Sequence, residues 1–115
     1  MIQHEKGKWG EDRAADFLRN RNFKILKRNF RKAFGEVDII AVKDKKIVFF
    51  EVKKWDSYNW EDLHCSINRS KIRRIQNLAE IYLQDHPEYK NYKVGFDLIL
   101  LSRRTEEPDH IVDFI

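Results

Sequence analysis

The sequence predicts an α/β fold in which a mixed β-sheet is flanked by helices. Two segments space their apolar residues as helices do, and residues 35–55 alternate in polarity as strands do. A chain of 115 residues, 42% hydrophobic and 37% charged, has room for one core, so we expect a single domain over residues 1–115. The predicted order is helix, three strands, helix, two strands.

The first predicted helix covers residues His4 to Asn20. Its apolar stripe consists of Ala14, Ala15, Phe17 and Leu18. Extending this stripe backward at helical spacing reaches Glu11, which places a carboxylate on the side that faces the protein. A glutamate beside an apolar stripe commonly pairs with a nearby lysine or arginine, so an ion pair and a functional acid both remain open for Glu11.

Three strands are predicted next. Phe23 to Asn29 forms the first and is followed by a basic loop. Gly35 to Lys43 and Lys46 to Trp55 are rich in β-branched and aromatic residues, and a short turn at Asp44 and Lys45 separates them. We therefore expect an antiparallel hairpin.

The alternation within this hairpin predicts its register. A tight turn pairs Lys43 with Lys46, and the same register pairs Val42 with Ile47, Ile40 with Phe49, Asp38 with Glu51, and Glu36 with Lys53. One side then carries Val37, Ile39, Ala41, Val48, Phe50 and Val52, and the other side carries the charged residues. Asp38, Glu51 and Lys53 are thus predicted to share one face.

The rest of the chain predicts one helix and two strands. The helix is expected from about Ser66 to Gln84, with an apolar stripe of Ile72, Ile75, Leu78, Ala79, Tyr82 and Leu83. The strands are expected at Val94 to Ser102 and at His110 to Ile115, with a polar turn between them.

The acids of the hairpin form a candidate metal site. Directly opposed carboxylates repel, and a divalent cation such as Mg²⁺ or Mn²⁺ would compensate Asp38 and Glu51 with oxygen ligands. Lys53 could orient an attacking water or offset charge on a phosphate. Glu36 and Glu11 are candidate further ligands. The alternatives are a raised carboxylate pKa with a Lys53 salt bridge, and pairing of Glu36 with Lys53.

Positive charge is concentrated in the first third of the chain. The net charge is +4; residues 1–34 hold ten Lys/Arg and four Asp/Glu, or +6, which leaves −2 for the remainder. A second basic group occupies the first turns of the second helix, where the dipole disfavours cations. The candidate phosphate-binding residues are Arg28, Arg31, Lys32, Arg69, Lys71 and Arg74. A solvated surface remains the alternative for both groups.

Three aromatic residues at or just after the end of the predicted hairpin are candidates for contact with nucleic acid. Trp55, Tyr58 and Trp60 could stack on an unpaired base or cover a core edge. No apolar run approaches membrane-spanning length, so we expect a cytoplasmic protein without membrane contact. Cys65 and the four histidines do not follow a zinc-ligand spacing.

An ordered set of motifs resembles a known superfamily. The set comprises Gly10-Glu11, Asn29-Phe30-Arg31, Gly35-Glu36-Val37-Asp38, Glu51-Val52-Lys53, Lys71, Arg74-Ile75 and Phe96-Asp97. It resembles the PD-(D/E)xK nucleases with their restriction-endonuclease-like fold, especially archaeal Holliday-junction resolvases, and more closely the YraN-like family of small bacterial proteins.

The resemblance implies a Mg²⁺- or Mn²⁺-dependent DNA endonuclease that acts on branched or otherwise structured DNA, in the manner of resolvases that work as two-fold dimers. It gives Asp38, Glu51 and Lys53 the catalytic places and Glu11 the place of the helix-borne acid. Trp55 and Gly95 depart from the family pattern, which commonly has arginine at both places. A non-catalytic module that binds nucleic acid or a protein partner stays open as the alternative.

Overall fold

The computed structural model describes residues 3–54, 68–102 and 107–115 and confirms the predicted order of elements. These elements are α1 (Gln3–Asn20), β1 (Lys24–Lys32), β2 (Gly35–Lys43), β3 (Lys46–Lys54), α3 (Arg69–Asp85), the 3₁₀ turn η1 (Pro87–Tyr89), β4 (Lys93–Leu101) and β5 (Asp109–Ile111). In the part of the chain that is described, no helix combines the length and apolar composition needed to cross a membrane.

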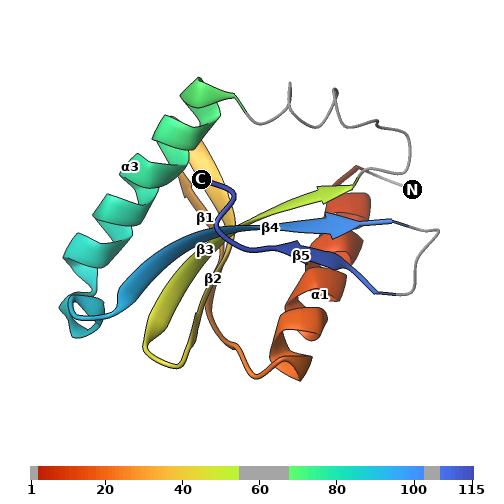
Figure 1. The fold of residues 1–115 in the computed structure, drawn as a ribbon. Coiled ribbons are helices and arrows are strands. Elements are labelled where there is room, and N and C mark those ends of the chain that lie inside the picture. Colours follow the sequence, from red (N-terminus) through yellow and green to blue (C-terminus); the bar gives the residue numbers. More distant parts are fainter. Residues whose placement is uncertain (1–2, 55–67, 103–106) are drawn as a thin grey trace.

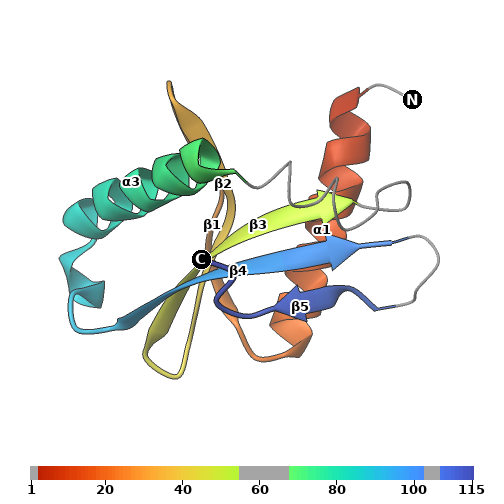
Figure 2. The ribbon, with the colours of Figure 1, turned by 45° about the horizontal axis from the view of Figure 1, so that its top comes forward.

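The five strands form one mixed sheet in the order β1-β2-β3-β4-β5. β3 and β4 run parallel, and the other neighbouring strands are antiparallel. The helices α1 and α3 cover opposite faces of this sheet (Figure 1, Figure 2). The predicted fold class, a mixed sheet flanked by helices, is therefore confirmed.

Each face of the sheet buries its own apolar cluster. On the α1 face, Val48 and Phe50 of β3 pack with the helix residues Ala14, Ala15 and Leu18. On the α3 face, Ile47 and Phe49 of the same strand pack with helix residues that include Ile75, Leu78 and Tyr82. Alternation along β3 thus supplies both cores, as a strand buried on both sides requires.

Several predicted boundaries need correction. β1 continues to Lys32, where a basic loop was predicted, because Phe30, Arg31 and Lys32 pair with β2. β5 ends at Ile111 and does not extend to Ile115, since Asp113 takes a positive φ of 54°. α3 begins at Arg69, where the Asn68 side chain caps the first turn by accepting a hydrogen bond from the Lys71 N–H.

The hairpin turn between β2 and β3 forms as predicted. Asp44 and Lys45 both have positive φ, of 50° and 60°, as a type I′ turn requires. Close to the turn the predicted register is confirmed, with the pairs Lys43–Lys46, Val42–Ile47 and Ile40–Phe49.

The predicted register is wrong at the other end of the hairpin. Pairing of β2 with β3 ends at Ile39–Phe50, so Asp38 does not pair with Glu51, nor Glu36 with Lys53. Instead, Oδ2 of Asp38 accepts a hydrogen bond of 2.7 Å from the backbone N–H of Val52. The side chain takes the place of a main-chain partner, which lets the strands separate where two opposed acids would repel.

The interruption also changes which face Val37 occupies. The alternation predicted Val37 on the side of Ile39, but Val37 packs with Ile40 in the cluster under α3, while Ile39 lies under α1. The polarity alternation of β2 therefore breaks at Asp38, between the two helices.

Candidate functional site

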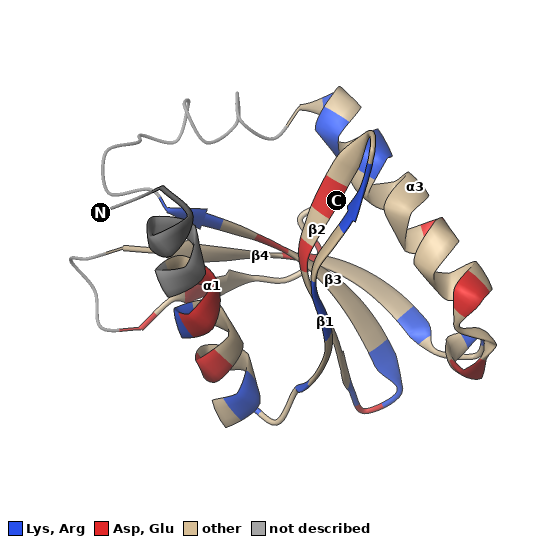
Figure 3. Cartoon of the chain, turned by 180° about the vertical axis from the view of Figure 1, so that it is seen from behind, with Lys and Arg blue, Asp and Glu red and all other residues tan. Residues whose placement is uncertain are grey.

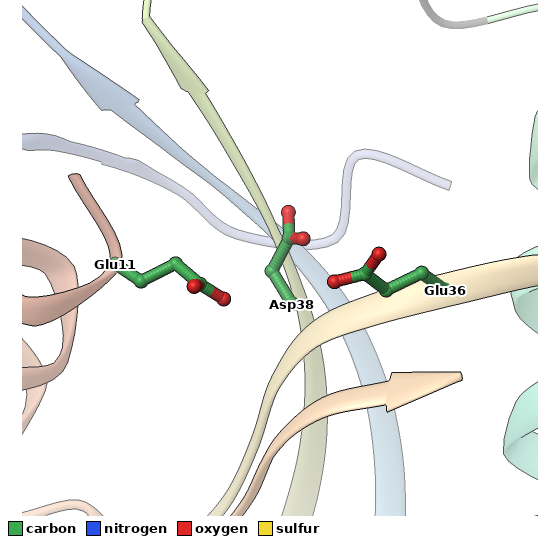
Figure 4. Close-up of side chains that lie close together, drawn as sticks. All are labelled: Glu11, Glu36 and Asp38. Atoms are coloured by element: carbon green, nitrogen blue, oxygen red, sulfur yellow. The ribbon is translucent and has the colours of Figure 1, made fainter. Parts of the chain in front are cut away.

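Three carboxylates converge where the hairpin pairing ends. Glu11 comes from α1, and Glu36 and Asp38 come from β2; one oxygen of each lies within 4.8 Å of the others. Figure 4 shows the side chains of Glu11 and Glu36 extending toward Asp38 from opposite sides. The structure thus assembles a compact acidic group from two elements, with Glu11 at least 25 positions from Glu36 and Asp38 in the chain.

The pKa of Asp38 is strongly raised. Burial raises its pKa from 3.8 to about 8, the negative charges of Glu51, Glu36 and Glu11 act in the same direction, and the Val52 N–H opposes them. The ionised form of Asp38 is thus unfavourable in the metal-free protein. A bound cation would reverse this balance, because it favours the charged carboxylate.

Glu11 keeps one oxygen without a partner. Its Oε2 accepts a hydrogen bond of 3.1 Å from Nδ2 of Asn29, whereas Oε1 is buried and has no hydrogen-bond partner among the described residues. Asn29 has a positive φ of 55° opposite the interruption in β2. The sequence analysis did not include Asn29 in the site. The available signal was an asparagine within a strand, because asparagine tolerates a left-handed φ.

Glu51 lies beside this group but is bound to lysines. The residue is 7% exposed, and its Oε1 lies 2.6 Å from Nζ of Lys71 and 3.4 Å from Nζ of Lys53. Burial and the neighbouring Lys71 lower the pKa of Lys53. Burial acts to lower the pKa of Lys71 too, but the hydrogen bond and the charge of Glu51 outweigh it, and its pKa is raised.

A pocket of about 300 Å³ lies beside two of the three clustered carboxylates and the Glu51–Lys71 ion pair. It is lined by Gly35, Glu36, Asp38, Glu51, Lys71, Arg74 and Ile75. A side chain at Gly35 would place its Cβ 3.3 Å from Leu78 and 3.5 Å from the Cβ of Arg74, so the glycine allows β2 to approach α3 closely. The pocket therefore lies between the open end of the hairpin and the first turns of α3.

The residues present fit a hard divalent cation. The donors are carboxylate oxygens, and one of them is buried without a hydrogen-bond partner among the described residues. Burial and the neighbouring acids raise the pKa of Asp38. Mg²⁺ and Mn²⁺ prefer such oxygen ligands. The compact group brings together Asp38 and the two candidate further ligands, Glu11 and Glu36. Glu51, predicted to hold the metal with Asp38, is outside this group and lines the adjacent pocket.

Glu36 also has a cationic partner. Its Oε2 accepts hydrogen bonds from Nε and Nη2 of Arg31, at 3.1 and 2.8 Å. The predicted alternative, an ion pair of Glu36 with Lys53, is not what the described residues show, since Lys53 lies against Glu51. The difference arises because pairing of β2 with β3 ends at Ile39–Phe50, so Glu36 has no partner opposite it on β3.

The predicted phosphate-binding residues divide into two groups. In β1, Nη2 of Arg28 lies 2.6 Å from Oδ1 of Asp12, and Nη2 of Arg31 lies 2.8 Å from Oε2 of Glu36. Lys32 lies over the ring of Phe30. On α3, Lys71 and Arg74 line the pocket, and Arg69 is exposed. Figure 3 shows Lys and Arg along β1 and in the first turns of α3, with acidic residues of β2 between them.

The predicted aromatic contacts lie outside the described residues. This holds for Trp55, Tyr58 and Trp60. Their proposed stacking and packing roles stay predictions.

A second buried acid lies away from the pocket. Asp97 of β4 is 2% exposed; its Oδ2 lies 2.7 Å from Nε2 of His110, and its Oδ1 accepts a 2.9 Å hydrogen bond from the Asp113 N–H. The sequence offered Phe96-Asp97 only as a family motif. The structure shows that this acid ties the chain after β5 to the sheet.

Comparison with known proteins places the chain in a family. The model of the uncharacterised protein family UPF0102 matches residues 10–101. A UPF0102 protein of Persephonella marina is 44% identical over 99 residues, which cover 86% of this chain and 84% of the relative. One from Fusobacterium nucleatum is 39% identical over 115 residues, or 100% and 94% of the two chains. A third, from Syntrophomonas wolfei, is 34% identical over 114 residues, or 97% and 98%. The family resemblance found in the sequence is thus confirmed, and the chain belongs to the UPF0102, or YraN-like, family.

Proposed function

We propose that this chain is a Mg²⁺- or Mn²⁺-dependent DNA endonuclease. The observation that carries the proposal is the group of three carboxylates within 4.8 Å, beside a pocket in which Glu51 contacts the ammonium groups of Lys71 and Lys53. Acids held this close favour a cation, and adjacent ammonium groups favour an anion such as phosphate. Metal-assisted phosphodiester cleavage uses both.

Glu11, Glu36 and Asp38 would hold the cation, with Glu51 adjacent. A divalent ion in such a site lowers the pKa of water and polarises a phosphate. Lys53 lies next to Glu51, and its lowered pKa suits it to orient a water or take part in proton transfer. Asp38 is kept in place by the Val52 N–H, so its carboxylate is oriented before any ligand binds.

The basic residues around the pocket support DNA as the substrate. Arg74 lines the pocket, and Arg31 and Lys32 lie on the β1 side of Glu36. These cations suit phosphates on either side of a scissile bond. The resemblance to resolvases supports branched DNA as the preferred form and a two-fold dimer as the acting species.

Cleavage assays with metal and a single charge change test the proposal. Labelled duplex, single-stranded, flap and four-way-junction DNA would be incubated with Mg²⁺ or Mn²⁺ and the wild-type protein. Asp38→Asn should reduce cleavage by at least about 100-fold, because even outer-shell partners of a metal site contribute about 10- to 100-fold. Asparagine keeps an oxygen that can accept the Val52 hydrogen bond.

Asp44→Asn is the matched control. Asp44 lies in the turn at the opposite end of the same hairpin, and its positive φ of 50° suits asparagine. This variant should cleave like the wild type. Equal cleavage by the Asp38 and Asp44 variants, or cleavage that persists in EDTA, contradicts the proposal.

A second candidate is a nucleic-acid-binding module without turnover. Its supporting observation is that Glu36 and Glu51 already have cationic partners, Arg31 at 2.8 Å and Lys71 at 2.6 Å. In that case the acids serve only as ion pairs. Salt-sensitive DNA binding without product under either metal favours this module, and the absence of DNA binding at low salt favours a protein partner.

A further inference from the structure

Lys71 makes the shortest contact in the pocket. Its Nζ lies 2.6 Å from Oε1 of Glu51, closer than Nζ of Lys53, which lies 3.4 Å from the same oxygen. Sequence reasoning treated Lys71 as a phosphate contact on a helix surface. The structure instead directs this side chain from α3 onto a buried acid of β3.

The backbone fixes Lys71 while its side chain has space to move. Oδ1 of Asn68 accepts a 2.9 Å hydrogen bond from the Lys71 N–H and caps the helix there. The side chain is 26% exposed and borders the 300 Å³ pocket. Its anchored main chain and open surroundings allow the ammonium group to exchange partners without unfolding the helix.

Charge balance makes Lys71 a competitor of a cation. In the metal-free protein, Lys71 forms an ion pair with Glu51. The charge of Glu51 raises the pKa of Asp38 more than the charges of Glu36 and Glu11 do. A divalent ion among these acids would repel the ammonium group and attract the same Glu51 oxygen. Lys71 and the cation therefore compete for the carboxylate of Glu51.

We propose that Lys71 is an exchangeable positioning residue: it holds Glu51 while the metal site is empty, and it moves to a phosphate of bound DNA when a cation engages the acids. The second half of this proposal, the move of Lys71 to a DNA phosphate, rests on the proposed function. Its first half, the competition for Glu51, concerns the protein and the cation alone.

Calorimetric titration with Mn²⁺ in the absence of DNA tests the competition. Lys71→Met removes the competing charge and keeps the aliphatic length, and Lys71→Arg retains the charge. We expect Lys71→Met to bind Mn²⁺ about tenfold more tightly than wild type, because a cation close to the site is removed. Lys71→Arg should bind like wild type.

Arg74→Met is the control for general electrostatics. Arg74 lines the same pocket with the same charge, but its hydrogen bonds go to O and Oγ of Ser70. It should raise Mn²⁺ affinity by less than about threefold. In an E51Q background, Lys71→Met should no longer strengthen Mn²⁺ binding, since the contested carboxylate charge is gone.

Three results overturn the inference. They are unchanged or weaker Mn²⁺ binding by Lys71→Met in a protein that melts as a folded domain, equal gains for Lys71→Met and Arg74→Met, and a gain that persists in the E51Q background. Because these measurements contain no nucleic acid, they stand whether or not the protein cleaves DNA.

Cleavage then tests the second half. Lys71→Met should lower kcat/KM on the preferred DNA about tenfold while it binds Mn²⁺ more tightly, and Lys71→Arg should restore most of the activity. A structural defect would weaken both properties together. Tighter Mn²⁺ binding with unchanged kcat/KM overturns the move to phosphate, whereas no cleavage by the wild type contradicts the proposed function and leaves the competition intact.

Discussion

Two aspartates of this sheet, Asp97 fully buried and Asp38 partly buried, have opposite surroundings. Asp97 is 2% exposed and is bound by His110 and by the Asp113 N–H. Among the described residues, Asp38 accepts a hydrogen bond from the Val52 N–H and lies close to the carboxylates of Glu11 and Glu36. Both are aspartates on strands, yet donors surround the first and carboxylates surround the second.

This difference distinguishes an acid that stabilises the fold from an acid whose surroundings suit a function. A buried acid with donors on both oxygens stabilises the chain segments that it joins. A buried acid among acids costs stability until a cation arrives, and perturbed groups of this kind are enriched at functional sites. The following predictions test this contrast, beginning with the largest expected effect.

Metal should stabilise the protein through Asp38 and not through Asp97. At Mn²⁺ concentrations 100 times Kd, the free energy of unfolding should rise by about 2.7 kcal/mol, as mass action requires for binding to the native state. Urea unfolding with and without Mn²⁺ measures this gain. Asp38→Asn should lose most of it, and Asp97→Asn should keep it; equal gains in both variants contradict the contrast.

Removing Asp97 should destabilise the fold directly. Asp97→Ala leaves Nε2 of His110 and the Asp113 N–H without their acceptor, at a cost of about 2 kcal/mol. Urea unfolding in EDTA measures it. Asp109→Ala, at an exposed position at the start of β5, is the control and should change stability little. Equal effects at both positions would show that Asp97 does not tie the chain after β5.

The pH dependence of stability should reveal Asp38. Its pKa is raised from 3.8 to about 8, so the native state holds a proton that the unfolded state has released between these values. Stability in EDTA should therefore fall as pH rises from about 4 to about 8, by at least about 1 kcal/mol relative to Asp38→Asn. Unfolding curves across this range measure it. Asp44→Asn should keep the wild-type slope; parallel curves for wild type and Asp38→Asn refute the assignment.

Glu11 should affect metal binding more than folding. Glu11→Gln preserves an oxygen for the Asn29 hydrogen bond and should change stability by less than about 0.5 kcal/mol. Mn²⁺ affinity, measured by titration, should still fall several-fold because the partnerless oxygen loses its charge. Asp16→Asn, on the exposed side of the same helix, should leave affinity unchanged. The same affinity in both variants excludes Glu11 as a ligand.

Much of the fold could be predicted from local patterns. Alternation in β3 correctly assigned Ile47 and Phe49 to one face and Val48 and Phe50 to the other. The tight turn at Asp44 and Lys45 fixed the register nearby. Glu51 and Lys53 share a face because they are two residues apart in one strand, and the structure places them 3.4 Å apart.

Other features required the tertiary structure. The hairpin register fails beyond Ile39 and Phe50 because a side chain, that of Asp38, bonds to the backbone of β3. The alternation of apolar and polar residues predicts the pairing of regular strands. It does not predict where a side chain replaces a main-chain hydrogen-bond partner. The contact of Lys71 with Glu51 likewise depends on how closely α3 packs against β2 at Gly35.

The sequence by itself determined which residues could carry the chemistry: the acids Asp38, Glu51, Glu36 and Glu11, and the lysine Lys53, follow from strand and helix periodicity. Only the tertiary structure decided which of them converge, because the positions of α1 and α3 relative to the sheet are set by core packing, not by local spacing. Helix packing brings Glu11 to Asp38 and Lys71 to Glu51, and no periodicity in the chain specifies those distances.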